Sequence, residues 1–209
     1  MSDPFPPLSV LVWGDFACFT RPELKAERVS YPILTPTAAR GILEAICWSP
    51  AIRWRITTLT ILRPIQYIAL TRNERTTRQQ ITATPTGHPR TLRQTLALRA
   101  VAYIITAQID LQPHASQPLA AYRDRMRRRL RRGQSVTQPY LGCREFAAGF
   151  APVPADIQPL DLTADLGPLL HHLSYAADGS GHATPHFFHA RLEHGVLHVP
   201  PPPEVPDAA

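Results

Sequence analysis

The chain of 209 residues has almost no lysine: 21 of its 22 basic residues are arginine, and Lys25 is the exception. A GC-rich genome accounts for most of this deficit, but not for where the charges lie. Residues 1–150 carry 21 basic and nine acidic side chains, whereas residues 151–209 carry one basic and seven acidic side chains. Because arginine makes bidentate contacts with phosphate and stacks on bases, this asymmetry predicts a polyanionic partner for the first 150 residues.

Cysteine and long apolar runs are also scarce. Cys18, Cys47 and Cys143 lie far apart and form no CxxC pair, which argues against a disulfide framework and against a thiolate zinc site. No apolar run approaches the roughly 20 residues of a membrane helix. The N-terminus has an acid and three prolines, where a signal peptide has a cation and an apolar stretch. We therefore expect buried free thiols in a cytoplasmic protein with no membrane contact.

The common motifs of nucleotide and nucleophile chemistry are missing. There is no GxxxxGK(S/T), no GxGxxG and no GxSxG, which argues against ATP hydrolysis and serine hydrolase chemistry. Histidine is plentiful after residue 150, but HExxH is absent and no acidic residue stands at a metal-ligand interval. A His-rich metalloenzyme is an alternative, while the pattern favours structural histidines, no metal and no cofactor. These seven residues are His171, His172, His182, His186, His189, His194 and His198.

Apolar periodicity predicts three strands and two helices within residues 1–150. Thr35 and Pro36 are the predicted N-cap and first residue of the first helix, and Gly133 is predicted to end the second helix. A phase slip near Thr57-Thr58 predicts a bulge. The predicted elements are, in chain order, a strand over 8–13, a helix that begins at Pro36 and has its apolar stripe within 37–48, a strand over 52–62, a strand over 101–111 and a helix over 117–132.

This order predicts an α+β fold with a ferredoxin-like (RRM-like) β-α-β-β-α-β domain, a layout shared by many RNA-recognition modules. The polar stretch from Arg72 to Arg93 is predicted as a hairpin or loop insertion. Short strands are expected over 169–175, 186–192 and 195–199, with a hairpin turn at Glu193-His194-Gly195. We therefore expect a ferredoxin-like RNA-binding domain over 1–148, a small β-rich C-terminal subdomain over 149–200 and a proline-rich tail over 201–209.

The densest charge lies on the second predicted helix, where seven of the ten residues from Arg123 to Arg132 are arginine. Like charges three and four residues apart repel by a few tenths of a kcal/mol per pair, so such a cluster is destabilising unless an anion offsets it. A solvated basic face would normally be diluted with acids, and only Asp124 is present. Nucleic-acid contact is the favoured interpretation, and a solvated face or an acidic protein partner is the alternative.

Three stretches together resemble a known family: VWGDFACFTRPELKAERVSYPILTPTAARGILEAICW (12–48), LRPIQYIALTRNE (62–74) and RRGQSVTQPYLGCREF (131–146). They are similar to the Cas5 family of CRISPR-associated proteins in its type I-C (d) subtype. The resemblance implies an antiviral protein that caps a CRISPR surveillance complex (Cascade). It would hold the 5′ handle of the crRNA beside the backbone and large subunits, and so act indirectly on target DNA. In type I-C systems it also implies cleavage of pre-crRNA repeats.

The residues that the resemblance assigns to cleavage are substituted. In the family, the metal-independent cut is ascribed to a Tyr or His near the end of the first helix and a Lys-His pair opening the second. The matching positions here are Cys47, Ala121 and Tyr122. Attack by a 2′-hydroxyl needs proton transfer and charge stabilisation; Ala121 supplies neither, and Cys47 is a weak substitute for a phenol. Tyr122 is the one candidate catalytic residue, although its place on the apolar stripe favours core packing.

We therefore expect a subunit that binds RNA without efficient cleavage, and the alternative is an endoribonuclease with substituted residues around Tyr122. Phe19 and Tyr140 are candidate stacking platforms, with core packing as the alternative for each. The predicted phosphate contacts follow the first strand, open the central loop and cover the second helix: Arg21, Lys25, Arg28, Arg72, Arg75, Arg78, Arg123, Arg125, Arg127, Arg128, Arg131 and Arg132.

Overall fold

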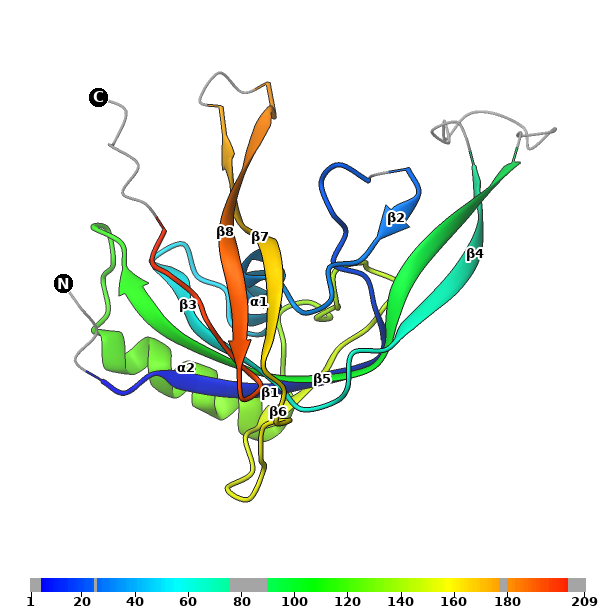
Figure 1. Cartoon of the computed structure of the whole chain (residues 1–209). Helices are drawn as coiled ribbons and strands as arrows, with labels where there is room; N and C mark the ends of the chain where they lie inside the picture. The colour runs from blue at the N-terminus through cyan, green and yellow to red at the C-terminus, as the bar shows by residue number, and fades with distance from the viewer. Residues whose placement is uncertain (1–4, 25, 76–89, 177–179, 203–209) are drawn as a thin grey trace.

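The computed structural model describes residues 5–24, 26–75, 90–176 and 180–202. Two helices and nine strands follow one another along this part of the chain (Figure 1). They are β1 (Leu8–Ala17), β2 (Arg28–Val29), α1 (Pro36–Ile46), β3 (Ile52–Ile61), β4 (Tyr67–Arg75), β5 (Arg90–Leu111), α2 (Leu119–Arg132), β6 (Gly149–Pro152), β7 (Ala164–Tyr175), β8 (Ala183–Glu193) and β9 (Val196–His198).

The predicted helix and strand signals are confirmed where they are local. The Thr35 side chain accepts a hydrogen bond from the Ala38 amide, so it caps α1 at its first turn. Gly133 adopts the left-handed conformation and ends α2. The register of β3 against β5 shifts between Ile56 and Thr58, where the bulge was predicted.

The strands form one sheet in the order β6-β1-β5-β3-β9-β8-β7, with β2 and β4 also paired to β5. All pairings are antiparallel except that of β2 with β5. The elements β1, α1, β3, β5, α2 and β6 follow the predicted β-α-β-β-α-β order, and their strands are neighbours in the sheet. The α+β class predicted from the sequence is therefore confirmed.

Strand β5 is 22 residues long and belongs to two parts of the molecule. Residues 101–111 lie between β1 and β3, whereas residues 90–98 pair with β4. Together β4 and the first half of β5 form an arm that rises from the sheet (Figure 1). Ala100, between the two halves, has a φ of +51°, a left-handed conformation that is unfavourable for a residue with a Cβ atom.

The arm confirms a hairpin, one of the two predicted forms, at the ends of the stretch from Arg72 to Arg93. Residues 72–75 are already the end of β4, and residues 90–93 are the start of β5, with Arg72 opposite Arg93. Of the two predicted forms, the ends take the hairpin, in which cross-strand pairing compensates for their polar composition. The residues between them, Arg78 included, lie outside the described residues.

The three C-terminal strands extend the main sheet. Strand β9 pairs with β3, placing Thr58 opposite His198, and β8 and β7 follow in turn. Leu169, Ala190 and Leu192 belong to the same apolar core as α1 and β1. The predicted domain boundary between residues 148 and 149 stays a prediction. The sheet and the apolar core both include residues from the two sides of it.

The predicted hairpin turn between β8 and β9 is confirmed. His194 and Gly195 both have positive φ angles, of +49° and +79°, as a two-residue type I′ turn requires. A Cβ atom on Gly195 would lie 2.1 Å from the Leu160 carbonyl oxygen. Glycine is therefore the residue that this position accepts.

Both helices pack their apolar stripes into the core. Ile42, Leu43 and Ile46 of α1 and Met126 and Leu130 of α2 are buried. The chain after α2 crosses the C-terminal end of α1, where the amides of residues 136 and 137 both donate to the Ala45 carbonyl. This contact supplies one of the hydrogen bonds that the last turn of a helix otherwise lacks, and it holds α2 beside the end of α1.

Candidate nucleic-acid interface

Helix α2 separates its arginines into buried and exposed groups. Arg127, Arg128, Arg131 and Arg132 are exposed, and we call these four residues the α2 arginine face. Asp124 lies 3.5 Å from Arg127 and is the one acidic residue of the helix. The last turn of α2 is rich in arginine, where positive charge is favourable for the helix dipole. The face therefore presents a concentrated positive charge to solvent.

Arg123, one of the predicted RNA contacts, does not belong to this exposed face. Its residue surface is 1% exposed. The guanidinium lies over the Phe5 ring at 5.1 Å and donates a hydrogen bond to the Pro6 carbonyl. Arg123 precedes Met126 by three residues, so helical geometry places it beside the apolar stripe. It anchors the segment before β1 to α2.

Arg129 joins α2 to the end of α1. Its Nη1 donates a hydrogen bond of 2.7 Å to the Ile46 carbonyl. The next residue, Cys47, is the C-cap of α1 and is 1% exposed. Burial raises the pKa of the Cys47 thiol, and the charges of Arg129, Arg125 and Arg128 oppose that shift. The C-terminal end of α1 therefore lies next to the arginines of α2.

Two of the three positions that the resemblance assigns to cleavage, Cys47 and Tyr122, are buried. Cys47 is a buried thiol with a raised pKa, so it is protonated at neutral pH. Ala121 carries a methyl group. Tyr122 is 3% exposed, and the Arg125 guanidinium lies 5.4 Å from the centre of its ring. Tyr122 therefore packs in the core. Its place on the apolar stripe favours this interpretation.

The predicted RNA contacts near β2 and β4 form a separate cluster around Glu145. Arg28 and Arg72 lie 3.3 and 2.9 Å from the same Glu145 oxygen, and Arg72 also donates to Thr95 at 2.9 Å. The arginines of this cluster belong to β2 and β4, which lie on the side of the molecule away from α2 (Figure 1). The predicted contacts therefore do not form one continuous surface.

Arg21, Lys25 and Arg75 complete the predicted set. Arg21 lies over the Tyr31 ring at 4.6 Å and 3.8 Å from Glu23. Lys25 lies outside the described residues, as does Arg78, and Arg75 is described through its backbone pairing in β4 alone.

Cys143 lies within the Glu145 cluster, beside Cys18. Arg28 donates to the Cys143 sulfur at 3.3 Å, and that sulfur lies 3.6 Å from the Cys18 carbonyl oxygen. The pKa of Cys143 is lowered to about 6, chiefly by a hydrogen bond with the Cys18 thiol and also by the Arg28 charge, while burial and the Glu145 charge oppose the shift. The same hydrogen bond, with burial, raises the pKa of Cys18. Cys18 and Cys47 are buried as expected, whereas Cys143 is partly exposed.

The two predicted stacking platforms have different surroundings. Phe19 is 2% exposed and packs edge-on against Tyr103, with the ring centres 6.1 Å apart. It is therefore a core residue, as the core-packing interpretation has it, and not a stacking platform. Tyr140 is 38% exposed and lines a hollow beside α1. An antiparallel bridge to Ala147 holds its backbone.

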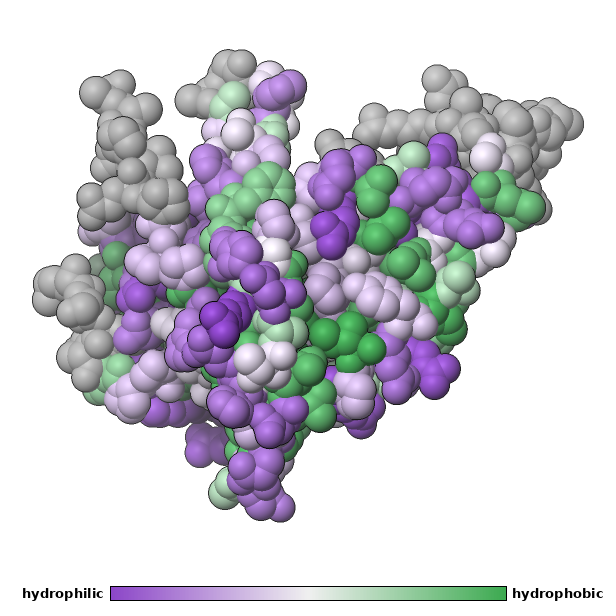
Figure 2. Space-filling model, in the orientation of Figure 1, coloured by the Kyte–Doolittle hydropathy of each residue, from purple (hydrophilic) through white to green (hydrophobic). Residues whose placement is uncertain are grey.

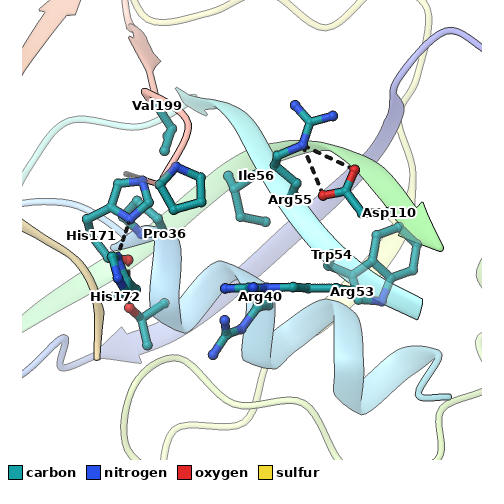
Figure 3. Close-up of a pocket in the computed structure, with 12 residues that line it drawn as sticks. Pro36, Arg40, Arg53, Trp54, Arg55, Ile56, Asp110, His171, His172 and Val199 are labelled. Carbon is teal, nitrogen blue, oxygen red and sulfur yellow. Dashed lines mark hydrogen bonds and ion pairs between the residues drawn. The ribbon is translucent and has the colours of Figure 1, made fainter. Parts of the chain in front are cut away.

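A second basic site, which the sequence did not predict, lies between α1, β3 and β7 (Figure 3). Arg40 and Arg53 lie side by side in this hollow, with His171 and His172 on the opposite wall (Figure 3). These residues come from three elements that meet only because β7 joins the sheet next to α1. No local sequence signal indicates such a meeting.

The histidines make contacts within the sheet. His172 stacks on His186, with ring centres 4.4 Å apart, and His186 contacts the Ser174 hydroxyl at 2.7 Å. His189 and His194 each contact an aspartate. Across the described ranges, no three histidine, cysteine, aspartate or glutamate residues gather as metal ligands do. In the same ranges, neither helix is long and apolar enough to cross a membrane.

Apolar side chains gather in the hollow between the β7–β8 hairpin and the arm, next to polar ones (Figure 2). Phe187 of β8 and Leu92 and Leu96 of β5 are among the exposed apolar residues. Arg21, Leu170 and Phe187 line part of this hollow.

The same architecture is found in solved CRISPR-associated proteins. One structure, titled as a CRISPR-associated protein, aligns with a TM-score of 0.70 and 20% identity over 95% of this chain and 93% of its own. Residues 8–200 match the model of a family described as CRISPR-associated protein, Cas5, of the Cas5d type. The chain belongs to this family, which confirms the resemblance found in the sequence.

Two curated relatives match over nearly the whole chain. A protein of Thermus thermophilus is 43% identical over 92% of this chain and 91% of its own length. A protein of Mannheimia succiniciproducens is 38% identical over 91% and 93%, respectively. Both are named CRISPR pre-crRNA endoribonuclease Cas5d.

Proposed function

We propose that this protein is the crRNA-binding subunit of a type I-C-like Cascade complex and that it holds the 5′ handle of the guide. The observation that carries the proposal is the α2 arginine face, held against the end of α1 by the Arg129 contact to the Ile46 carbonyl. Family membership indicates which kind of RNA is bound, because both curated relatives are named for pre-crRNA. The backbone and large subunits are its proposed partners, target DNA is reached through them, and the cytoplasm is the proposed location.

The α2 arginine face suits a phosphate backbone better than a protein partner. Arg128, Arg131 and Arg132 have no ion pair with any residue in the described ranges, and Asp124 contacts Arg127 at 3.5 Å. Exposed arginines along one face can follow successive phosphates, and each phosphate neutralised releases counterions. Such contacts hold the strand in position without reading its sequence.

Binding without efficient cleavage follows from the residues at the end of α1. A 2′-hydroxyl attack needs one group to take the proton and another to protonate the leaving oxygen. Neither the buried Cys47 thiol nor Ala121 performs these steps, and the Tyr122 ring lies in the core. The arginines could stabilise negative charge on the phosphorane, but that contribution alone leaves both proton transfers to solvent.

The alternative is a metal-independent endoribonuclease that uses substituted residues. The names of both curated relatives favour it, at 43% and 38% identity over about nine-tenths of the chain. Tyr122 would be its acid or base. This function requires the Tyr122 hydroxyl to reach the RNA from a buried position.

Incubating the purified protein with its cognate repeat RNA in EDTA separates the two functions. We expect binding in a fluorescence anisotropy titration, and an RNA that stays intact on a denaturing gel. A single cut leaving a 5′-hydroxyl handle, lost in Tyr122→Phe and retained in Arg128→Ala, would establish the alternative. Failure of the wild-type protein to bind this RNA would overturn both.

A further inference from the structure

We propose that the groove formed by α1, β3, β7 and the segment around Tyr140 is a binding site for one nucleotide of the RNA, with its phosphate at Arg40 and Arg53 and its base against Tyr140. The inference rests on the proposed RNA-binding function and adds to it a second contact region away from the α2 arginine face.

The groove consists of two adjoining hollows. The smaller one, of about 90 Å³, contains Arg40 and Arg53, and the larger one, of about 380 Å³, contains Tyr140. Thr37 and Arg40 line both of them. A basic recess therefore adjoins an aromatic one, the combination that proteins use for single-stranded RNA, where backbone and base need different contacts.

The basic recess carries positive charge that its own acids do not cancel. Arg55 donates to both oxygens of Asp110, at 3.3 and 3.1 Å, so that pair is internally neutral (Figure 3). Arg40 lies 3.5 Å from Glu44, one helical turn away. The Arg53 side chain has no hydrogen bond or ion pair with another residue of the described ranges. Two guanidinium groups held side by side repel each other, and a phosphate between them would remove that repulsion.

The wall opposite these arginines is fixed in place. Thr37 donates to the His171 carbonyl at 2.9 Å, which ties β7 to the start of α1. His171 and His172 contact each other through their Nδ1 atoms at 2.8 Å. Burial lowers the pKa of His172, and the positive charges of its neighbours, Arg53 and Arg40 among them, lower it further. The recess therefore has a positive potential at the position of His172.

The aromatic recess is rigid. Leu141 is hydrogen-bonded to Phe146 and to Cys18, which holds the segment of Tyr140 against the end of β1. The next residue, Gly142, has a φ of +84°, and a Cβ atom there would lie 2.0 Å from the Cys18 carbonyl oxygen. The tight approach requires glycine and fixes Tyr140 as a wall of the recess. An exposed ring with a fixed backbone is suited to stack on a base of any identity.

The groove lies within reach of a strand bound to the α2 arginine face. Arg40 precedes Ile46 by six residues of α1, a rise of about 9 Å along the helix. Ile46 is the residue that Arg129 contacts. One RNA strand can therefore run from α2 along α1 into the groove.

The test compares RNA affinity by fluorescence anisotropy with the cognate repeat RNA. The Arg40→Ala/Arg53→Ala double variant should reduce the magnitude of the slope of log K against log salt by about 0.7, because one single-strand phosphate contact contributes about that much. Tyr140→Ala should raise the Kd about tenfold through the lost stacking, while Tyr140→Phe should keep the wild-type Kd. Thermal unfolding of each variant establishes that it is folded.

The outcomes separate this inference from the proposed function. If the wild-type protein binds the RNA and the groove variants bind it equally well, the nucleotide site is wrong and the RNA-binding function stands. If the wild-type protein does not bind, the function itself fails. A second arm titrates adenosine monophosphate: wild-type affinity for the monophosphate as high as for the RNA, lost in both groove variants, would make this a free-nucleotide site and overturn the RNA assignment.

Discussion

The Arg129 guanidinium on α2 donates a 2.7 Å hydrogen bond to the carbonyl of Ile46, the last residue of α1. The carbonyls of a last helical turn have no partner within the helix, and a cation there is favourable for the helix dipole. An arginine within the most basic run of the sequence thus has a structural role in joining the two helices. Its neighbours in the run remain available to a phosphate backbone.

Replacing Arg129 by alanine should lower the free energy of unfolding by about 1–2 kcal/mol, because a hydrogen bond from a charged donor to a helix-end carbonyl is lost. Chemical denaturation monitored by circular dichroism measures the change. Arg128→Ala is the matched control, since Arg128 is exposed, and it should leave the unfolding midpoint where it is. Equal losses in the two variants would contradict the structural role of Arg129.

Arg123→Ala should destabilise the protein more than any substitution on the α2 arginine face, by about 2–3 kcal/mol. It leaves the Pro6 carbonyl without its donor and opens a cavity against Phe5. RNA affinity of the folded variant, measured well below its unfolding temperature, should match that of the wild-type protein. A large loss of affinity with unchanged stability would return Arg123 to the RNA-binding surface.

The α2 arginine face should control the salt dependence of RNA binding. The triple variant Arg128→Ala/Arg131→Ala/Arg132→Ala should reduce the slope of log K against log salt by about 2, since each single-strand phosphate contact contributes about 0.7. Anisotropy titrations at several salt concentrations provide the slope. An unchanged slope would show that the face is merely solvated, or that it meets a protein.

Cys143 should react with iodoacetamide at a lower pH than an ordinary thiol. The thiolate is the reactive form, and the pKa of Cys143 is lowered to about 6. Its alkylation rate, followed by mass spectrometry, should therefore rise between about pH 5 and 7 and then level off, while an ordinary thiol is still gaining reactivity near pH 8.5.

The residue at position 18 tests the cause of this shift. Cys18→Ala removes the hydrogen bond that contributes most to the lowered pKa, so the alkylation curve should move to higher pH. Cys18→Ser retains a donor and should keep the curve near its wild-type position. If the two variants give the same curve, the hydrogen bond from residue 18 is not the cause.

The elements that could be predicted from the sequence are those with local causes. A threonine followed by proline caps a helix through contacts within four residues, and Gly133 ends one because a single residue needs a left-handed backbone. The bulge near Thr57 can be predicted because the alternation of apolar and polar residues changes phase within one strand. The β-α-β-β-α-β order follows from the order in which these local helix and strand patterns occur along the chain.

The features that sequence reasoning missed depend on long-range packing. Arg123 has the same neighbours in sequence as the exposed arginines, and its burial depends on Phe5 and Pro6, more than 100 positions away. Arg40, Arg53 and His172 meet because β7 joins the sheet beside α1. Neither periodicity nor spacing contains such information, since both describe one element at a time.

The length of β5 has a mechanical consequence. One uninterrupted strand carries both the arm and the centre of the sheet, so no flexible linker separates them. A load applied to the arm by a bound partner is transmitted along the backbone into the strands that flank α1. Ala100, with its left-handed backbone, lies between the two halves of β5 and is the position at which a load on the arm would change the direction of the strand.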